Sequence, residues 1–241
     1  MNRLALALFT FLLLLAPLAA QDAEATREEA DKVIGDFKRF YKNANENVRM
    51  AAVEDIGETN HPDIVPLLLA AMKDKSPKVR DAVVPALKKQ TSKGGVFILV
   101  REIGKTRDLE TRLALLETFK VTKPKVAYPK VLEFAKSRTF ELKLKAADLL
   151  AVMPSEKKKS ERALMKLIED KEAQVRGTAI DALAKLKHPE LLDVCLEKMR
   201  TDKDWRVQST AVSAIPALRA KRSVVPLIEF MSEAKGRLAD D

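Results

Sequence analysis

The sequence predicts an all-α fold: a right-handed α-solenoid (α-α superhelix) of six helical-hairpin repeats. One motif recurs six times along the 241-residue chain at intervals of 31 to 33 residues, and its clearest copies begin at Val48, Val79 and Val175. Self-similarity with such a period is the signature of stacked helical units. No segment combines apolar–polar alternation with β-branched side chains, so we expect no strands.

Each copy of the motif predicts an amphipathic first helix of a hairpin. Counted from the first residue as zero, offset +4 is mostly small and offset +8 is always large, and both fall on the stripe that a helix buries. Small residues let neighbouring helices approach, and large residues fill the space beside them. These positions are Ala52, Val83, Leu115, Ala146, Ala179 and Ala211 at +4, and Ile56, Leu87, Phe119, Leu150, Leu183 and Ile215 at +8.

A short polar turn and a second apolar helix follow each motif. Pro62 and Pro189 stand at the expected first turns of second helices, where a missing N–H costs nothing. Pro85 and Pro216 fall inside the expected first helices and should kink them. We place the within-repeat turns at residues 57–61, 88–95, 120–124, 153–159, 185–188 and 219–222.

The helix pattern Val-Arg-x-x-Ala-hydrophobic-x-Ala-Leu, as in VRDAVVPAL from Val79, resembles the HEAT repeat. It is most similar to the short HEAT-like repeats also found in phycobilisome lyases, over about residues 44 to 231. The resemblance extends to an aspartate six residues before the motif arginine, in Asp74–Arg80 and Asp170–Arg176. It implies that such side chains form an inter-repeat ladder. The family implies an architecture and leaves the function open.

The N-terminal residues are predicted to be a secretory signal peptide. Arg3 precedes the apolar run 4–15, and small residues end at Ala20. We therefore expect export to the periplasm or the extracellular space after cleavage near Ala20. Uncleaved, the same run would anchor the chain in a membrane. The expected domains are a signal peptide at 1–20, an N-terminal capping helix at 21–43, the repeat solenoid at 44–231, and a short charged C-terminal tail at 232–241. A capping box of Thr26 and Glu29 is expected to start the capping helix.

No catalytic, metal or cofactor motif is found in the sequence, so we expect no enzyme activity, no bound metal and no cofactor. Cys195 is the single cysteine, and its apolar helix face predicts a buried small hydrophobe. His61 and His188 each precede a proline at the same place in the first and fifth repeats. At about 8–10 Å for each stacked helix they lie roughly 40 Å apart, too far to share a metal, and a helix-capping role is expected.

Charge is the sequence feature that points beyond the fold. The chain carries a net charge of +9, and the within-repeat turns of repeats two to six, with the adjoining Lys125, hold fourteen basic residues against one acid. Because such turns share one edge of a solenoid, they predict a basic edge that either binds an anionic partner or only keeps the protein soluble. The basic edge comprises Lys88, Lys89, Lys93, Lys120, Lys123, Lys125, Lys157, Lys158, Lys159, Lys185, Lys187, Arg219, Lys221 and Arg222.

These features favour a non-enzymatic scaffold or adaptor that binds a protein through the concave face lined by second helices. The first alternative is a polyanion binder that docks its basic edge on acidic lipid, a cell-wall polymer or nucleic acid. Lysine predominates there without interleaved aromatics, which argues against nucleic acid. The second alternative is a phycobilin-lyase-like accessory protein, against which the signal peptide weighs. The mixed-charge positions expected on the concave face are Lys130, Glu133, Lys166, Glu169, Asp193 and Glu197.

Overall fold

The structure is a computed structural model that describes residues 24–218 and 224–237. Within these ranges the chain is all-helical, with thirteen α-helices, four short 3-10 turns and no strand. The chain divides into two compact units, residues 1–124 (unit 1) and 125–241 (unit 2). The expected signal peptide, with Arg3 and Ala20, lies outside the described residues, as do Arg219, Lys221 and Arg222 of the basic edge.

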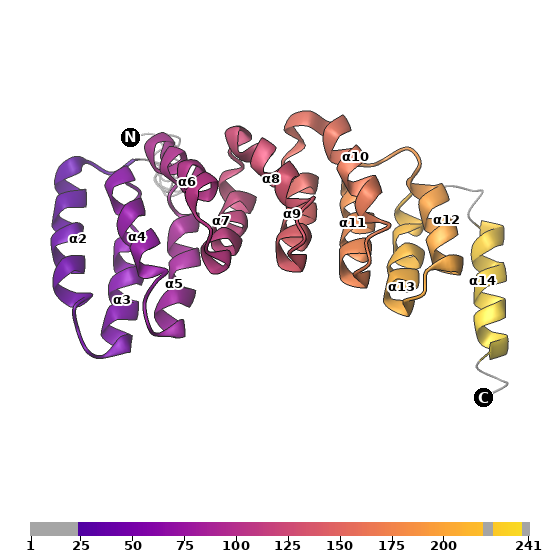
Figure 1. Ribbon diagram of the computed structural model, residues 1–241, viewed down its shortest axis with the longest axis horizontal. Coiled ribbons are helices and arrows are strands. Elements are labelled where there is room, and N and C mark those ends of the chain that lie inside the picture. The colour runs from indigo at the N-terminus through magenta and orange to yellow at the C-terminus, as the bar shows by residue number, and fades with distance from the viewer. Residues whose placement is uncertain (1–23, 219–223, 238–241) are drawn as a thin grey trace, which may run out of the picture. The chain divides into compact units, whose positions relative to one another are not determined.

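Unit 1 is a stack of helices that pack in chain order (Figure 1). The first helices α3, α5 and α7 pack on one another, and the second helices α4 and α6 pack beside them. Helix α2 packs on α3, and the capping box at its start is confirmed, because Glu29 N donates to Thr26 Oγ1. The helices are α2 (Arg27–Phe40), α3 (Glu46–Gly57), α4 (Val65–Ala71), α5 (Pro77–Lys88), α6 (Lys93–Lys105) and α7 (Leu109–Thr122).

Unit 2 repeats the same arrangement. The first helices α9, α11 and α13 pack in series, each second helix contacts the first helix that follows it, and α14 lies against α12 (Figure 1). The helices are α8 (Tyr128–Phe134), α9 (Phe140–Val152), α10 (Lys157–Leu167), α11 (Ala173–Lys185), α12 (Leu191–Thr201), α13 (Trp205–Ala214) and α14 (Val224–Arg237).

The buried residues of the first helices follow the repeat pattern of the sequence. All six side chains at offset +4 are buried, and Ala52, at 4 % exposure, is the most accessible of them. All six large side chains at offset +8 are 1 % exposed or less. The predicted burial pattern of the first helices is therefore confirmed. The approach of α3 to α5 also requires Gly57, since a Cβ there would stand 2.4 Å from Ala86 Cβ.

Several predicted boundaries differ from the structure. Pro85 lies inside α5, but α13 ends at Ala214, so Pro216 begins a 3-10 turn and does not kink a helix. Pro189 precedes α12 and does not belong to its first turn. Helix α14 runs to Arg237, into the segment expected as a charged tail. Helix ends also reach into the expected turns, because terminal turns of amphipathic helices are polar and look like loops in sequence.

Candidate functional site

The described residues hold no group of three or more His, Cys, Asp or Glu side chains that could bind a metal ion. Cys195 is fully buried, and burial raises the pKa of its thiol to about 11, which disfavours the reactive thiolate. His61 and His188 cap helical turns as expected: their Nδ1 atoms accept from Asp63 N and Glu190 N. No helix in the described ranges is long and apolar enough to cross a membrane.

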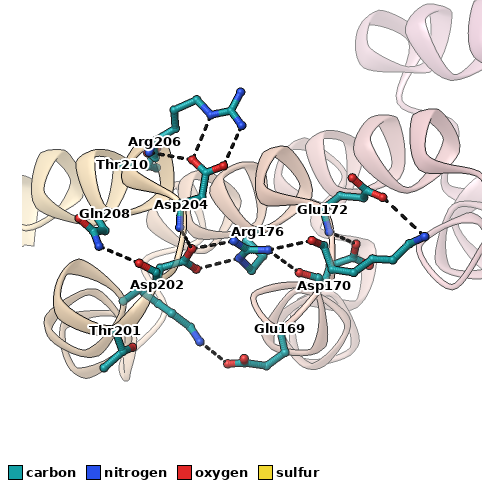
Figure 2. A network of polar contacts seen from close by, with 12 residues as sticks. Glu169, Asp170, Glu172, Arg176, Thr201, Asp202, Asp204, Arg206, Gln208 and Thr210 are labelled. Atoms are coloured by element: carbon teal, nitrogen blue, oxygen red, sulfur yellow. Dashed lines mark hydrogen bonds and ion pairs between the residues drawn. The ribbon is translucent and has the colours of Figure 1, made fainter.

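The motif arginines build a ladder between successive repeats. In unit 2, Arg176 Nε donates to Asp202 Oδ2 at 2.7 Å, and Arg176 Nη2 donates to Oδ1 at 2.6 Å (Figure 2). In unit 1, Arg49 holds Asp74 in the same bidentate way, with both bonds at 2.8 Å. The Arg176–Asp202 side chains are 5 % and 3 % exposed, so this rung is sealed from water. A structural role for these arginines is thereby confirmed.

The inter-repeat ladder that the resemblance implied is confirmed, and the structure shows which carboxylate each basic side chain binds. Arg176 does not contact the carboxylate of Asp170, six residues before it. Its Nη1 donates to the backbone carbonyl oxygens of Asp170 and Lys171, at 2.8 and 3.1 Å (Figure 2). The carboxylate of Asp170 pairs instead with Lys143 of the preceding repeat. Arg49 and Arg176 therefore each join their own turn through backbone carbonyls and the next turn through a carboxylate.

Each ladder aspartate also shapes its own turn. Asp202 Oδ1 accepts from Asp204 N at 2.9 Å, and Asp74 Oδ1 accepts from Ser76 N at the same distance. Burial raises the pKa of Asp202, but the hydrogen bonds from Arg176 and Asp204 N outweigh it, so the pKa lies below the usual value. The pKa of Asp74 is also lowered, chiefly by the hydrogen bonds from Arg49. Both aspartates thus remain ionised at neutral pH.

One rung of unit 1 is replaced by an exposed contact. Thr106 stands where the next aspartate would be, and it offers no carboxylate to Arg80. Arg80 Nε instead donates to Glu110 on α7 at 2.8 Å, with side chains 24 % and 54 % exposed. This contact lies in water and should contribute little, in contrast to the buried rungs.

The within-repeat turns are joined by a second set of buried polar contacts. In unit 1, Asn60 Oδ1 accepts from Thr91 N and Ser92 N, both at 3.0 Å, and Gln90 Nε2 donates to Gly57 O at 3.1 Å. In unit 2, Tyr128 OH bonds to Ser160 Oγ at 2.8 Å and donates to Glu156 O at 3.0 Å. These contacts fix the turn at 88–95 against the turn before it in unit 1, and the start of α10 against α8 in unit 2.

Acidic side chains, most of them on the helices, lie among the lysines of the basic edge. Lys88 pairs with Glu117 at 3.2 Å, Lys185 with Asp148 at 3.8 Å, and Lys89 with Glu58. Lys120, Lys157 and Lys159 also have carboxylate partners. The count by turns missed most of these acids because they lie on the helices and not in the turns. No ion pair within the described ranges involves the remaining lysines of the edge, which are Lys93, Lys123, Lys125, Lys158 and Lys187.

Two of these lysines adopt left-handed backbone conformations. Lys123 has a φ of 43° and Lys187 a φ of 54°, each just after a first helix. Lys187 N donates to Ala184 O and His188 N to Leu183 O, both at 3.0 Å, which is the Schellman pattern whose left-handed position favours glycine. The chain therefore places lysine where glycine would relieve strain. A cation at a helix C-terminus gains from the helix dipole, which offsets part of that strain.

The second helices present one exposed row each, which we call the second-helix face of its unit. In unit 2, Lys130 and Glu133 pair with each other on α8 at 2.7 Å. Glu169 pairs at 2.6 Å with Lys198, a buried lysine of α12 that the sequence pattern did not single out. The position of Lys198 among the apolar residues of α12 is the sequence signal that predicts its burial. The other exposed members predicted for this face are Lys166, Asp193 and Glu197.

The same architecture is found in known proteins. A family model described as HEAT repeats matches residues 37–120, 128–216 and 161–239. No curated protein matches the sequence. Among solved structures, an engineered protein is similar at 16 % identity and a TM-score of 0.46, with 79 % of this chain and 96 % of that chain covered.

Two further solved structures are similar. The complex of CpcE and CpcF of phycocyanin lyase from Nostoc sp. PCC7120 shares 15 % identity, with a TM-score of 0.49 and coverage of 85 % of this chain and 81 % of that chain. A second engineered protein shares 15 % identity at a TM-score of 0.47, over 88 % of this chain and 66 % of that chain. Because the matched family segments span most of the sequence and its helices follow the same repeat, this chain belongs to the HEAT-repeat family.

Proposed function

We propose that this protein is a non-enzymatic scaffold that binds a protein partner through its second-helix face. The observation that carries the proposal is a constant register of exposed side chains on the second helices. Glu133 on α8, Lys166 on α10 and Glu197 on α12 are all exposed, and each lies on the side of its helix opposite to the buried residues. The first helices, in contrast, use their recurrent polar positions in the ladder.

Affinity selection followed by charge reversal tests this proposal. Peptides selected on the purified protein from a random display library should lose binding when exposed second-helix residues are changed. Substitutions on an exposed first-helix position, such as Ser209→Glu on α13, should leave binding unchanged. Peptides that respond to the first-helix variant and to no second-helix variant would place the binding surface elsewhere.

A second candidate function is the binding of an anionic polymer or anionic membrane by the basic edge. The lysines without carboxylate partners support it, and so do the left-handed conformations of Lys123 and Lys187. Counterion release makes such binding fall steeply with salt. Reversal of Lys157, Lys158 and Lys159 to glutamate should abolish binding to vesicles rich in anionic lipid.

The control reverses Lys75, Lys136 and Lys203, which lie in turns between repeats and change the net charge by the same amount. Equal losses in both triple variants would show that net positive charge alone drives the binding. A phycobilin-lyase-like accessory role remains a prediction of the sequence resemblance, since the likeness to phycocyanin lyase extends to the fold alone.

Export is a further part of the proposal, based on Arg3, the apolar run 4–15 and the small residues that end at Ala20. N-terminal sequencing of native material should find a chain that begins at or within a few residues of Gln21. Intact Met1 in a soluble cytoplasmic pool would contradict export.

A further inference from the structure

The second-helix face of unit 1 leaves an aromatic side chain in solvent. Phe97 on α6 is 65 % exposed, and Arg101 follows it one helical turn later on the same row. Gly104 continues the row, and a Cβ at Gly104 would meet nothing within 4 Å. The aromatic ring and the guanidinium therefore border open space on the surface of α6.

The neighbouring helix α4 extends this surface. Pro66 and Ala70 on α4 are exposed, with the same spacing of one helical turn as Phe97 and Arg101. Helices α4 and α6 pack side by side, and both bury their opposite faces against first helices. The exposed side chains that α4 contributes here are small. We call Pro66, Ala70, Phe97 and Arg101 the aromatic–arginine surface.

The charge around this surface is positive. Arg101 is exposed, as are Lys93 and Lys105 at the two ends of α6, and no ion pair with a described residue involves any of the three. Two carboxylates lie nearby in sequence, Glu102 on α6 and Asp63 before α4. The surface thus combines an apolar centre with three cations that outnumber the two nearby carboxylates.

In unit 2, charged side chains of the second-helix face form ion pairs within the protein. There Lys130 pairs with Glu133, Lys198 with Glu169, and Arg200 on α12 with Glu229 on α14. The equivalent row of unit 1 has an aromatic and an arginine without such partners. Aromatic and arginine side chains are the types that carry most of the binding energy at protein interfaces.

We propose that the aromatic–arginine surface of unit 1 binds an acidic protein segment that carries an aromatic or large aliphatic anchor. The anchor covers Phe97 above Ala70, and flanking carboxylates pair with Arg101 and with the lysines at the ends of α6. Charge complementarity selects this occupant over a basic or a purely apolar one. The inference rests on the proposed second-helix function and assigns it to unit 1 and to acidic partners.

Selection from a library of random 16-residue displayed peptides tests the inference on the purified full chain. The selected peptides should be enriched in Asp and Glu around an aromatic or aliphatic residue. Measured by fluorescence anisotropy, their affinity should fall at least about tenfold on Phe97→Ala and on Arg101→Glu. Lys38→Glu on the exposed side of α2 is the matched control, because it makes the same charge change in unit 1 outside the second helices. Lys166→Glu on α10 tests the second-helix face of unit 2 in the same assay.

Each other outcome overturns the inference in a distinct way. Enrichment of basic peptides, or no enrichment at all, contradicts an acidic partner. Losses on Lys166→Glu without losses on Phe97→Ala would move the site to unit 2 and keep the proposed function. Losses on none of the three second-helix variants would remove both proposals. A change of oligomeric state on Phe97→Ala, with peptide binding intact, would assign the aromatic surface to a second copy of this chain.

Discussion

The buried rung between Arg176 and Asp202 offers a direct test of how burial sets the strength of the ladder. The variant Asp202→Asn keeps the shape of the side chain and the oxygen that accepts from Asp204 N at 2.9 Å. It removes the negative charge and turns an N–H donor toward the guanidinium of Arg176. Arg176 is 5 % exposed at its side chain, so its charge is left unpaired out of reach of water.

The expected loss follows from the burial of this pair. Breaking a buried ion pair by removal of one partner costs about 3–5 kcal/mol, and we expect about 3 kcal/mol because one acceptor oxygen remains. For a chain of this size that corresponds to a fall in melting temperature of roughly 6–12 °C. Circular dichroism melts measure this fall, and hydrogen exchange should localise it to the amides of α11 and α13.

The control is Glu110→Gln, which removes the partner of a motif arginine at an exposed contact. The Arg80 and Glu110 side chains are 24 % and 54 % exposed, so the change should cost at most about 1 kcal/mol. Similar melting temperatures for Asp202→Asn and Glu110→Gln would refute the view that burial, and not the motif itself, sets the strength of a rung.

Acid stability, a strained turn and a tight helix contact provide three more tests. The free energy of unfolding should decrease below about pH 4, because folding lowers the pKa values of Asp74 and Asp202. Their contribution is complete above the unfolded pKa near 3.9 and is lost as the pH falls toward the folded values. Acid denaturation followed by circular dichroism measures this, and a flat profile from pH 7 to pH 2 would contradict it. Lys187→Gly should raise the free energy of unfolding by about 1 kcal/mol, since glycine adopts the φ of 54° without strain; a destabilised variant would show that the lysine itself stabilises the turn. Ala179→Phe should destabilise the protein by about 1–3 kcal/mol, because Ala179 is fully buried between first helices. Ala51 is exposed, so Ala51→Phe should change stability little. Urea titrations of the two variants measure the difference.

The repeat and the buried positions of the first helices can be predicted from the sequence. Offsets +4 and +8 depend on local helical periodicity, which the order of residues states directly, so Ala179 and Leu183 are assigned to the core from that order alone. The cap formed by Thr26 and Glu29 is equally local. The partner of Arg176 cannot be predicted in the same way, because Asp170 and Asp202 occupy identical positions in consecutive repeats and only the three-dimensional stack distinguishes them.

Contacts between repeats also explain what the charge count missed. Glu58 and Glu117 lie about one repeat from the lysines Lys89 and Lys88 that they neutralise. Phe97 is a position on which the sequence made no prediction. It lies in an apolar stretch of α6, and the structure places its ring on the exposed row of the helix.

The ladder gives one repeat of unit 2 complementary charged ends. A segment that runs from Glu169 to Arg200 begins with the carboxylate of Asp170, which faces back to Lys143, and contains Arg176, whose partner Asp202 lies just beyond its end. The pair of Glu169 and Lys198 closes within the segment. A tandem copy would therefore give every one of these ions a counterpart. Such a chain can change its number of repeats by in-frame duplication or deletion without leaving an orphaned buried charge.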